Sequence, residues 1–146
     1  MTGEQLASDE IIYRAIWPVL VKETAEYKFD ELGPATFARK LRNQRLEPGL
    51  SVAWAKKVRR DEFISSIAKR NKALVRVAKS DVGSLQALGY KVFYTPTSSH
   101  DWHCSIRCSA CDLNNWDCLL VTGEDCQLSD LVSRVELSDA FQIVES

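Results

Sequence analysis

Long apolar runs are missing from this sequence of 146 residues. The most apolar stretch, residues 11–21, is interrupted by Arg14 and Pro18, whereas a membrane-spanning helix needs about 20 predominantly apolar residues. Residues 1–5 also lack the basic region and the apolar stretch of a secretory signal. These two absences predict a cytoplasmic protein without membrane contact.

Internal repeats and low-complexity tracts are also missing. A chain of this length can bury roughly 70% of the surface that it exposes when unfolded. Its 45% hydrophobic and 27% charged residues are typical of a soluble globular protein. We therefore predict one α+β domain over residues 1–146, with a mixed or antiparallel sheet of about five to six strands and two to four helices.

Alternating and helical spacings of apolar residues predict the individual elements. Strands are predicted at residues 11–16, 50–54, 73–78, 90–94, 102–108 and 116–122. Helices are predicted at residues 58–71, 81–88 and 130–135, the second with Ser80 as N-cap and Gly89 after its end. Residues 141–144 form a last strand or part of a C-terminal helix. We expect loop with a short helical turn in residues 17–36, and one or two amphipathic turns within residues 35–46.

Histidine and cysteine do not occur before residue 100, and both histidines and all five cysteines fall within residues 100–126. An odd number of cysteines in a reducing compartment is more typical of thiols or metal ligands than of disulfides. Zinc takes four N or S donors in a tetrahedron, and four residues have a compatible spacing: His100, His103, Cys108 and Cys111. The simpler alternative is that the cysteines are small buried side chains and that no cofactor is bound.

A cysteine nucleophile paired with a histidine is a weaker interpretation of the same segment. His103 and Cys104 are neighbours in sequence, and a reactive thiolate needs a basic neighbour. Adjacent residues of a strand point to opposite faces, however, so these two side chains cannot pair directly.

Charge is distributed unevenly although the net charge is −1. Residues 39–79 hold thirteen Lys or Arg and three acidic residues, which gives +10, whereas residues 1–38 and 80–146 sum to −4 and −7. This segregation is compatible with an anionic partner, or with a basic face that is solvated or packs within the molecule. Four residues of the 58–71 helix are the candidates for nucleic-acid or nucleotide binding: Arg59, Arg60, Lys69 and Arg70.

Several short motifs occur in an order that resembles a set of small uncharacterised bacterial proteins. Those proteins share YR-P, F, LSV and GL-V-P-HA-I blocks. The matching residues here are Tyr13-Arg14 with Pro18, Phe37, Leu50-Ser51-Val52, Leu88-Gly89-Tyr90-Lys91-Val92, Pro96 and His103-Cys104-Ser105-Ile106. Cys104 replaces the usual small residue, and the cysteine-rich part from Cys108 onward is outside the pattern. The resemblance covers roughly residues 11–107 and implies a bacterial cytosolic protein rather than a mechanism.

Arg14 on an early strand and Ser51 on a later one are similar to the arginine and serine that hold NAD in ADP-ribosyltransferase-like folds. In those folds a later glutamate or histidine completes the site, and His103 is the matching residue here. The analogy implies that Arg14 binds a pyrophosphate by charge-assisted hydrogen bonds. The alternative is that Arg14 and Ser51 are ordinary strand residues.

Three functions follow from these patterns. The first is a small binding or accessory module that acts through a protein partner, for example in a multi-gene defence system. It rests on the small size and on Trp102 and Trp116, since tryptophan is enriched at interfaces and is equally common in cores. The alternatives are nucleic-acid or nucleotide binding through residues 39–79, and an NAD-handling, ADP-ribosyltransferase-like enzyme using Arg14, Ser51 and His103.

Overall fold

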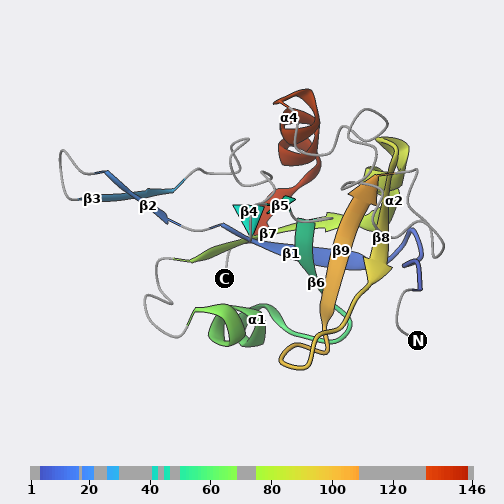
Figure 1. Cartoon of the computed structure of the whole chain (residues 1–146), viewed down its shortest axis with the longest axis horizontal. Helices are drawn as coiled ribbons and strands as arrows, with labels where there is room; N and C mark the ends of the chain where they lie inside the picture. The colour runs from blue at the N-terminus through green and yellow to red at the C-terminus, as the bar shows by residue number, and fades with distance from the viewer. Residues whose placement is uncertain are drawn as a thin grey trace.

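The computed structural model describes the backbone of residues 4–16, 18–21, 26–29, 41–42, 45–46, 50–68, 75–108 and 131–144. Side chains are described for residues 4–16, 50–68, 75–107 and 135–144. In chain order the elements are β1 (Ile11–Ile16), β2 (Pro18–Val21), β3 (Glu26–Phe29), β4 (Leu41–Arg42), β5 (Arg45–Leu46), β6 (Leu50–Trp54), α1 (Arg60–Ile67), β7 (Arg76–Asp81), α2 (Val82–Ala87), β8 (Tyr90–Tyr94), β9 (His103–Cys108), α4 (Leu131–Ala140) and β10 (Gln142–Val144) (Figure 1).

Six strands form the central sheet in the order β10-β7-β1-β6-β9-β8. Every neighbouring pair in this sheet is antiparallel. With α1, α2 and α4 packed against it, the sheet confirms the predicted α+β class. Two short antiparallel pairs, β2 with β3 and β4 with β5, complete the described strands.

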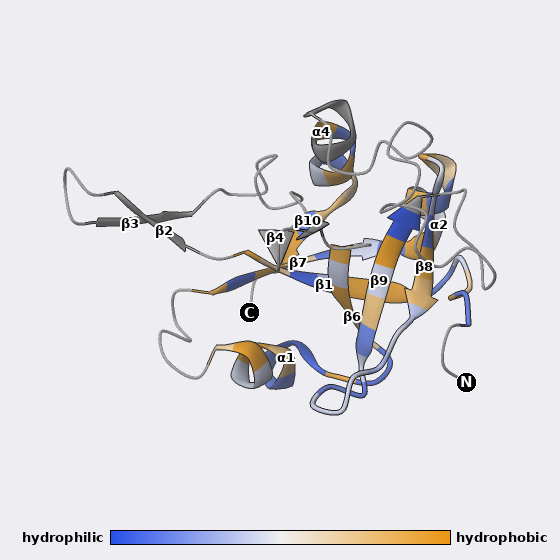
Figure 2. Cartoon of the chain, viewed as in Figure 1, coloured by the Kyte–Doolittle hydropathy of each residue, from blue (hydrophilic) through white to orange (hydrophobic). Residues whose placement is uncertain are grey.

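The helices divide between the two faces of the sheet, with α1 below it and α4 above it in Figure 1. On one face, β-strand residues such as Ile12 and Ile106 pack with Leu85 of α2 and Leu137 of α4. On the other face, Ala53 and further strand residues pack with Phe63 and Ile64 of α1. Figure 2 shows that hydrophobic residues recur along these strands and in α1 and α2. The sheet therefore has two separate apolar cores.

The local sequence explains why β6 lies between these cores. Leu50 and Val52 belong to the core beneath α2 and α4, whereas Ala53 belongs to the core beneath α1. Successive strand residues point to opposite faces, so Ser51 lies on the same side of the sheet as Ala53. Ser51 is exposed because α1 does not cover it.

The turn around α2 differs from the prediction in one residue. Asp81, not Ser80, is the N-cap, because its carboxylate accepts the backbone N–H of Ser84 at 2.9 Å. Ser80 remains in β7, and its hydroxyl donates to the carbonyl of Ala140 at 2.8 Å. Gly89 has φ = 93°, which confirms the positive φ expected after the helix.

Four predicted segments are wrong or shifted. The helix predicted at residues 130–135 extends to Ala140 as α4. Residues 18–21 and 26–29 pair as strands instead of forming loop, because Val19-Leu20-Val21 favours extended structure and Pro18 is tolerated as a first strand residue. Helical turns were expected within residues 35–46, but the described residues there, 41–42 and 45–46, are the strands β4 and β5; the rest of this segment lies outside the described residues. Strand β7 begins three residues later than predicted, at Arg76. The strand predicted at residues 116–122 lies outside the described residues.

No helix in the described ranges is long and apolar enough to span a bilayer.

Candidate functional site

The structure brings together Arg14, Ser51 and His103, which lie on the neighbouring strands β1, β6 and β9. Arg14 Nη1 donates to the backbone carbonyl of Ser51 at 2.6 Å. Ser51 Oγ lies 3.0 Å from His103 Nε2. Three residues separated by 37 and 52 positions in sequence therefore form one hydrogen-bonded chain.

The hydrogen bonds of His103 determine which ring nitrogen carries the proton. Nδ1 lies 2.8 Å from the backbone carbonyl of Thr95. A carbonyl oxygen only accepts, so Nδ1 is protonated in the neutral ring and Nε2 has the free electron pair. The tautomer is assigned from this bonding pattern. The hydroxyl of Ser51 must then donate its hydrogen to Nε2.

Two further hydroxyls hold the histidine in place. Thr95 Oγ1 lies 3.0 Å from His103 Nδ1 and 2.9 Å from the Oγ of Ser105. The backbone N–H of Thr95 donates to the carbonyl of His103 at 3.0 Å. Ser105 is only 6% exposed. The imidazole is therefore fixed by Thr95 through both its backbone and its side chain.

Strand pairing places these polar residues on one side of the sheet. Ser51 is the register partner of Ser105, and Ala53 is the partner of His103. Paired residues of antiparallel strands project to the same face. Ser51, His103 and Ser105 therefore share the side that α1 covers only in part.

Arg14 contacts the Ser51 backbone carbonyl, and its own side chain starts on the other side of the sheet. Strands β1 and β6 pair only at Ile12 with Trp54 and at Tyr13 with Ala53, so β1 does not pair with Ser51. Strand alternation puts the Cβ of Arg14 on the side of Ile12, opposite to the Ser51 side chain. The guanidinium nevertheless bonds to the Ser51 peptide group, so a positive charge lies one peptide group from the Ser51 hydroxyl.

The predicted zinc ligands do not converge within the described part of the chain. His103 and Cys108 are the two ends of β9, and five residues at about 3.3 Å each separate their Cα atoms by roughly 16 Å. Both ring nitrogens of His103 already have hydrogen-bond partners, and the ring of His100 stacks on Trp102 at 4.5 Å. No group of three or more His, Cys, Asp and Glu side chains in the described ranges could hold a metal ion. Cys111 lies outside them.

Cys104 is an inert neighbour of the histidine. Its side chain is fully buried in the core beneath α2 and α4. Burial raises the pKa of its thiol to about 12, because removal from water penalises the charged thiolate. The protonated thiol is not a nucleophile.

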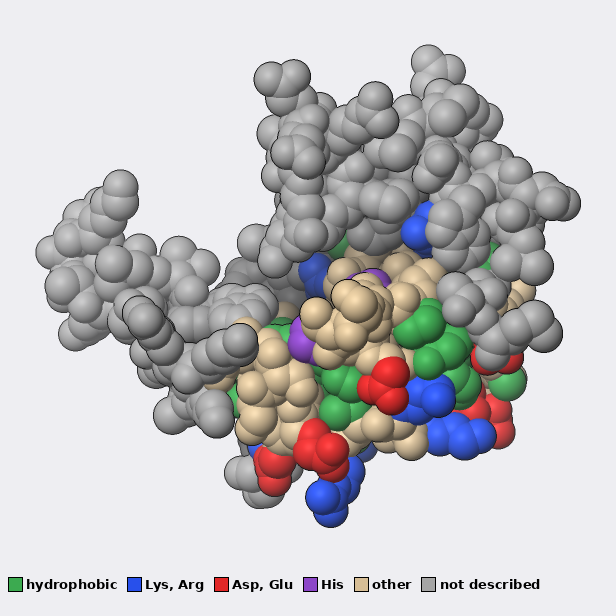
Figure 3. All heavy atoms as spheres, turned by 60° about the horizontal axis from the view of Figure 1, so that its bottom comes forward, with side chains coloured by type: hydrophobic (Ala, Val, Ile, Leu, Met, Phe, Trp, Pro, Cys, Tyr) green, Lys and Arg blue, Asp and Glu red, His purple; other side chains and the backbone are tan. Residues whose placement is uncertain are grey.

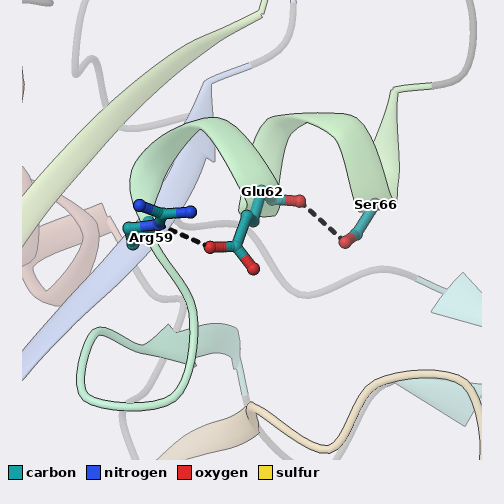
Figure 4. Close-up of polar contacts among 3 residues, drawn as sticks. All are labelled: Arg59, Glu62 and Ser66. Atoms are coloured by element: carbon teal, nitrogen blue, oxygen red, sulfur yellow. Dashed lines mark hydrogen bonds and ion pairs between the residues drawn. The ribbon is translucent and has the colours of Figure 1, made fainter.

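The basic candidates at the start of α1 form ion pairs where they are described. Arg59 bonds to Glu62 at 2.7 Å (Figure 4). Arg60 bonds to Asp61 at 3.1 Å. The ion pair with Glu62 raises the pKa of Arg59. Figure 3 shows basic and acidic side chains next to one another on the described part of this face. Lys69 and Arg70 lie outside the described residues.

Trp102, one of the two tryptophans considered for partner binding, is a core residue. It is 7% exposed, and its ring meets that of Phe63 edge to face at 5.1 Å. Trp116 lies outside the described residues. The hypothesis of a protein partner therefore stays a prediction from the sequence.

No protein-family model matches the chain, and no match to a curated protein or to a solved structure reaches significance.

Proposed function

We propose that the chain is a hydrolytic or group-transfer enzyme in which His103 is the general base. The supporting observation is the orientation of its ring, with Nδ1 bonded to the Thr95 carbonyl and Nε2 to the Ser51 hydroxyl. A base must present an electron pair within about 2.6–3.2 Å of the proton that it removes. Nε2 meets this requirement in the neutral tautomer.

In this proposal the site contains a general base, His103, and a permanent positive charge, Arg14. His103 takes a proton from an attacking hydroxyl, and the Thr95 carbonyl stabilises the imidazolium through the Nδ1 hydrogen bond. Arg14 adds a permanent positive charge beside Ser51. That charge favours a substrate that carries an anionic group, such as a phosphate.

NAD is the specific substrate that we propose for this site. Its pyrophosphate is negatively charged, which the nearby positive charge of Arg14 favours electrostatically, and its glycosidic bond to nicotinamide can be broken by an attacking hydroxyl that His103 deprotonates. The supporting observation is that the three residues suggested by the resemblance to ADP-ribosyltransferase-like folds lie in one hydrogen-bonded chain.

The test is incubation of the purified chain with NAD and quantification of released nicotinamide by chromatography. We expect His103→Gln to lower the rate by about 10²- to 10⁴-fold, the usual contribution of a general base. His100→Gln is the matched control, because these are the two histidines of the chain and His100 makes no described bond to Ser51. Equal rates for the two variants would overturn the assignment of His103.

Arg14→Lys tests the charge separately. Lysine keeps the positive charge and loses the planar arrangement of donors, so we expect a loss of about 10- to 150-fold in kcat/KM, equivalent to one hydrogen bond to a charged group. Arg59→Lys is the control on the exposed start of α1. Absence of nicotinamide release from the unaltered chain would remove NAD as the substrate.

A further inference from the structure

We infer that Ser51 is itself the attacking hydroxyl and forms a covalent ester with an electrophilic substrate. The inference rests on the proposed role of His103, and it does not depend on NAD as the substrate. It assigns to Ser51 a role beyond that of a residue that orients the histidine.

The geometry supplies the parts that a serine nucleophile requires. The Ser51 hydroxyl is exposed and lies 3.0 Å from His103 Nε2, to which it donates in the neutral tautomer assigned above. A third group, the Thr95 carbonyl, orients the far side of the imidazole at 2.8 Å. Nucleophile, base and orienting group in hydrogen-bond contact are the pattern by which such sites are recognised, whatever their order in sequence.

Other serine hydroxyls with described contacts are bonded differently. Ser66 donates to the carbonyl of Glu62 and Ser138 to that of Val135. Ser84 bonds to the carboxylate of Asp81, and Ser105 is buried against Thr95. Within the described side chains, Ser51 is thus the serine whose hydroxyl meets an imidazole.

The chemical step balances without a further reactant. As Ser51 Oγ attacks the electrophilic carbon or phosphorus, its proton passes to His103 Nε2 and a bond to the leaving group breaks. The imidazolium then returns the proton to the leaving group, or to solvent when that group leaves as a stable anion. Water, deprotonated by the same nitrogen, later attacks the adduct, the bond to Ser51 Oγ breaks, and the imidazolium returns the proton to that oxygen.

A fluorophosphonate reagent tests the inference without knowledge of the natural substrate. Attack by Ser51 forms an O–P bond and expels fluoride, and the mass increase can be located by peptide mass spectrometry. We expect one label, on Ser51, with none on the Ser51→Ala variant. His103→Gln should slow labelling by about 100-fold or more. Ser65→Ala, which alters an exposed serine of α1, should label at the original rate.

A measurement on the unaltered chain covers the case in which a variant fails to fold. When histidine is labelled with ¹⁵N, the NMR spectrum of the imidazole nitrogens contains signals from two residues only, His100 and His103. Labelling of Ser51 should shift the Nε2 signal of His103 and leave that of His100 in place.

Several outcomes would overturn the inference: no label, a label on another serine, or equal labelling of the folded His103→Gln variant. Labelling of Ser51 without nicotinamide release would sustain it and remove NAD. Nicotinamide release without labelling would overturn Ser51 as the nucleophile and keep NAD as the substrate.

Discussion

The two faces of the sheet differ in the polarity of their described side chains, even where those side chains belong to consecutive residues. Beneath α2 and α4, the strands contribute an apolar layer in which Ile106, Leu137 and others are fully buried. On the opposite face, a second apolar core packs beneath α1, and a hydrogen-bonded cluster of hydroxyls and an imidazole lies beside it. One face is thus mainly apolar, whereas the other combines apolar packing with a polar cluster.

His103 and Cys104 show the contrast within two consecutive residues of β9. Cys104 points into the apolar layer, where burial raises the pKa of its thiol to about 12. His103 points to the other face, where three hydrogen bonds fix its ring. Reactivity is thus decided by the face on which a side chain lies, rather than by its chemical type.

The largest expected effect compares these two residues directly. His103→Gln should lower the catalytic rate by about 10²- to 10⁴-fold, equivalent to about 2.7–5.4 kcal/mol of activation free energy. Cys104→Ala should retain activity within a few-fold, because the buried thiol takes no part in the reaction. Rate measurements on both variants at one temperature are sufficient. A catalytic loss in the folded Cys104→Ala variant equal to that of His103→Gln would refute the comparison.

The second prediction concerns the stability that the apolar face provides. Leu137→Ala should lower the free energy of unfolding by about 2–5 kcal/mol, since it removes a fully buried side chain and leaves a cavity. Val135→Ala, on the same helix but 42% exposed, should change it by less than about 0.5 kcal/mol. Urea denaturation distinguishes these values. Similar losses for both variants would mean that α4 does not seal this core.

The third prediction uses alkaline pH to isolate the buried thiol. The pKa of Cys104 rises from about 9 to about 12 on folding, so between these values the folded chain binds more protons than the unfolded chain. Stability must therefore fall as pH increases from 9 towards 12, by at most about 1.4 kcal/mol per pH unit. In the Cys104→Ala variant, the free energy of unfolding should depend less on pH. Urea denaturation at about pH 8 to 10, on either side of the pKa of the unfolded thiol, measures this. An unchanged slope would contradict burial of the thiol.

The smallest effect concerns the cap that begins α2 over the apolar face. Asp81→Ala should cost about 1 kcal/mol, because the N–H of Ser84 loses its acceptor. Hydrogen bonds from Ser84 lower the pKa of the Asp81 carboxyl, so this stabilisation is present at neutral pH and is lost as acid brings the pH down through the lowered value. Asp81→Asn keeps an acceptor and should remove the acid dependence. Thermal unfolding at pH 7 and at about pH 3 would measure both effects.

Much of the fold follows from local patterns. Apolar alternation in Leu50, Val52 and Trp54 predicts β6, and the helical spacing of Phe63 and Ile64 predicts α1. Pairing order does not follow, because register depends on contacts between distant segments. The β2 and β3 pair was missed since each strand is only four residues long, which gives too few alternations to detect.

The sequence suggested three residues of the candidate site but not their connections. The resemblance suggested Arg14, Ser51 and His103, which the structure joins by hydrogen bonds, whereas Thr95 and Ser105 were not considered. The polar alternation of His103 and Ser105 in a strand was a usable signal for one of them. Thr95 acts through its backbone carbonyl, which every residue has, so no sequence pattern could identify it. The zinc hypothesis stays a prediction, and spacing along the chain could not show that an extended strand separates His103 from Cys108.

The bonds between Thr95 and His103 also make residues 96–102 a closed loop with a fixed neck. The backbones of these two residues are joined at 3.0 Å, while Ser98 and Ser99 at the tip are exposed. A fluorescent reporter attached at Ser99 would therefore lie in solvent, beyond the Thr95–His103 hydrogen bond, and leave the imidazole undisturbed. From this position, the fluorescence of the reporter could be measured while candidate ligands are added.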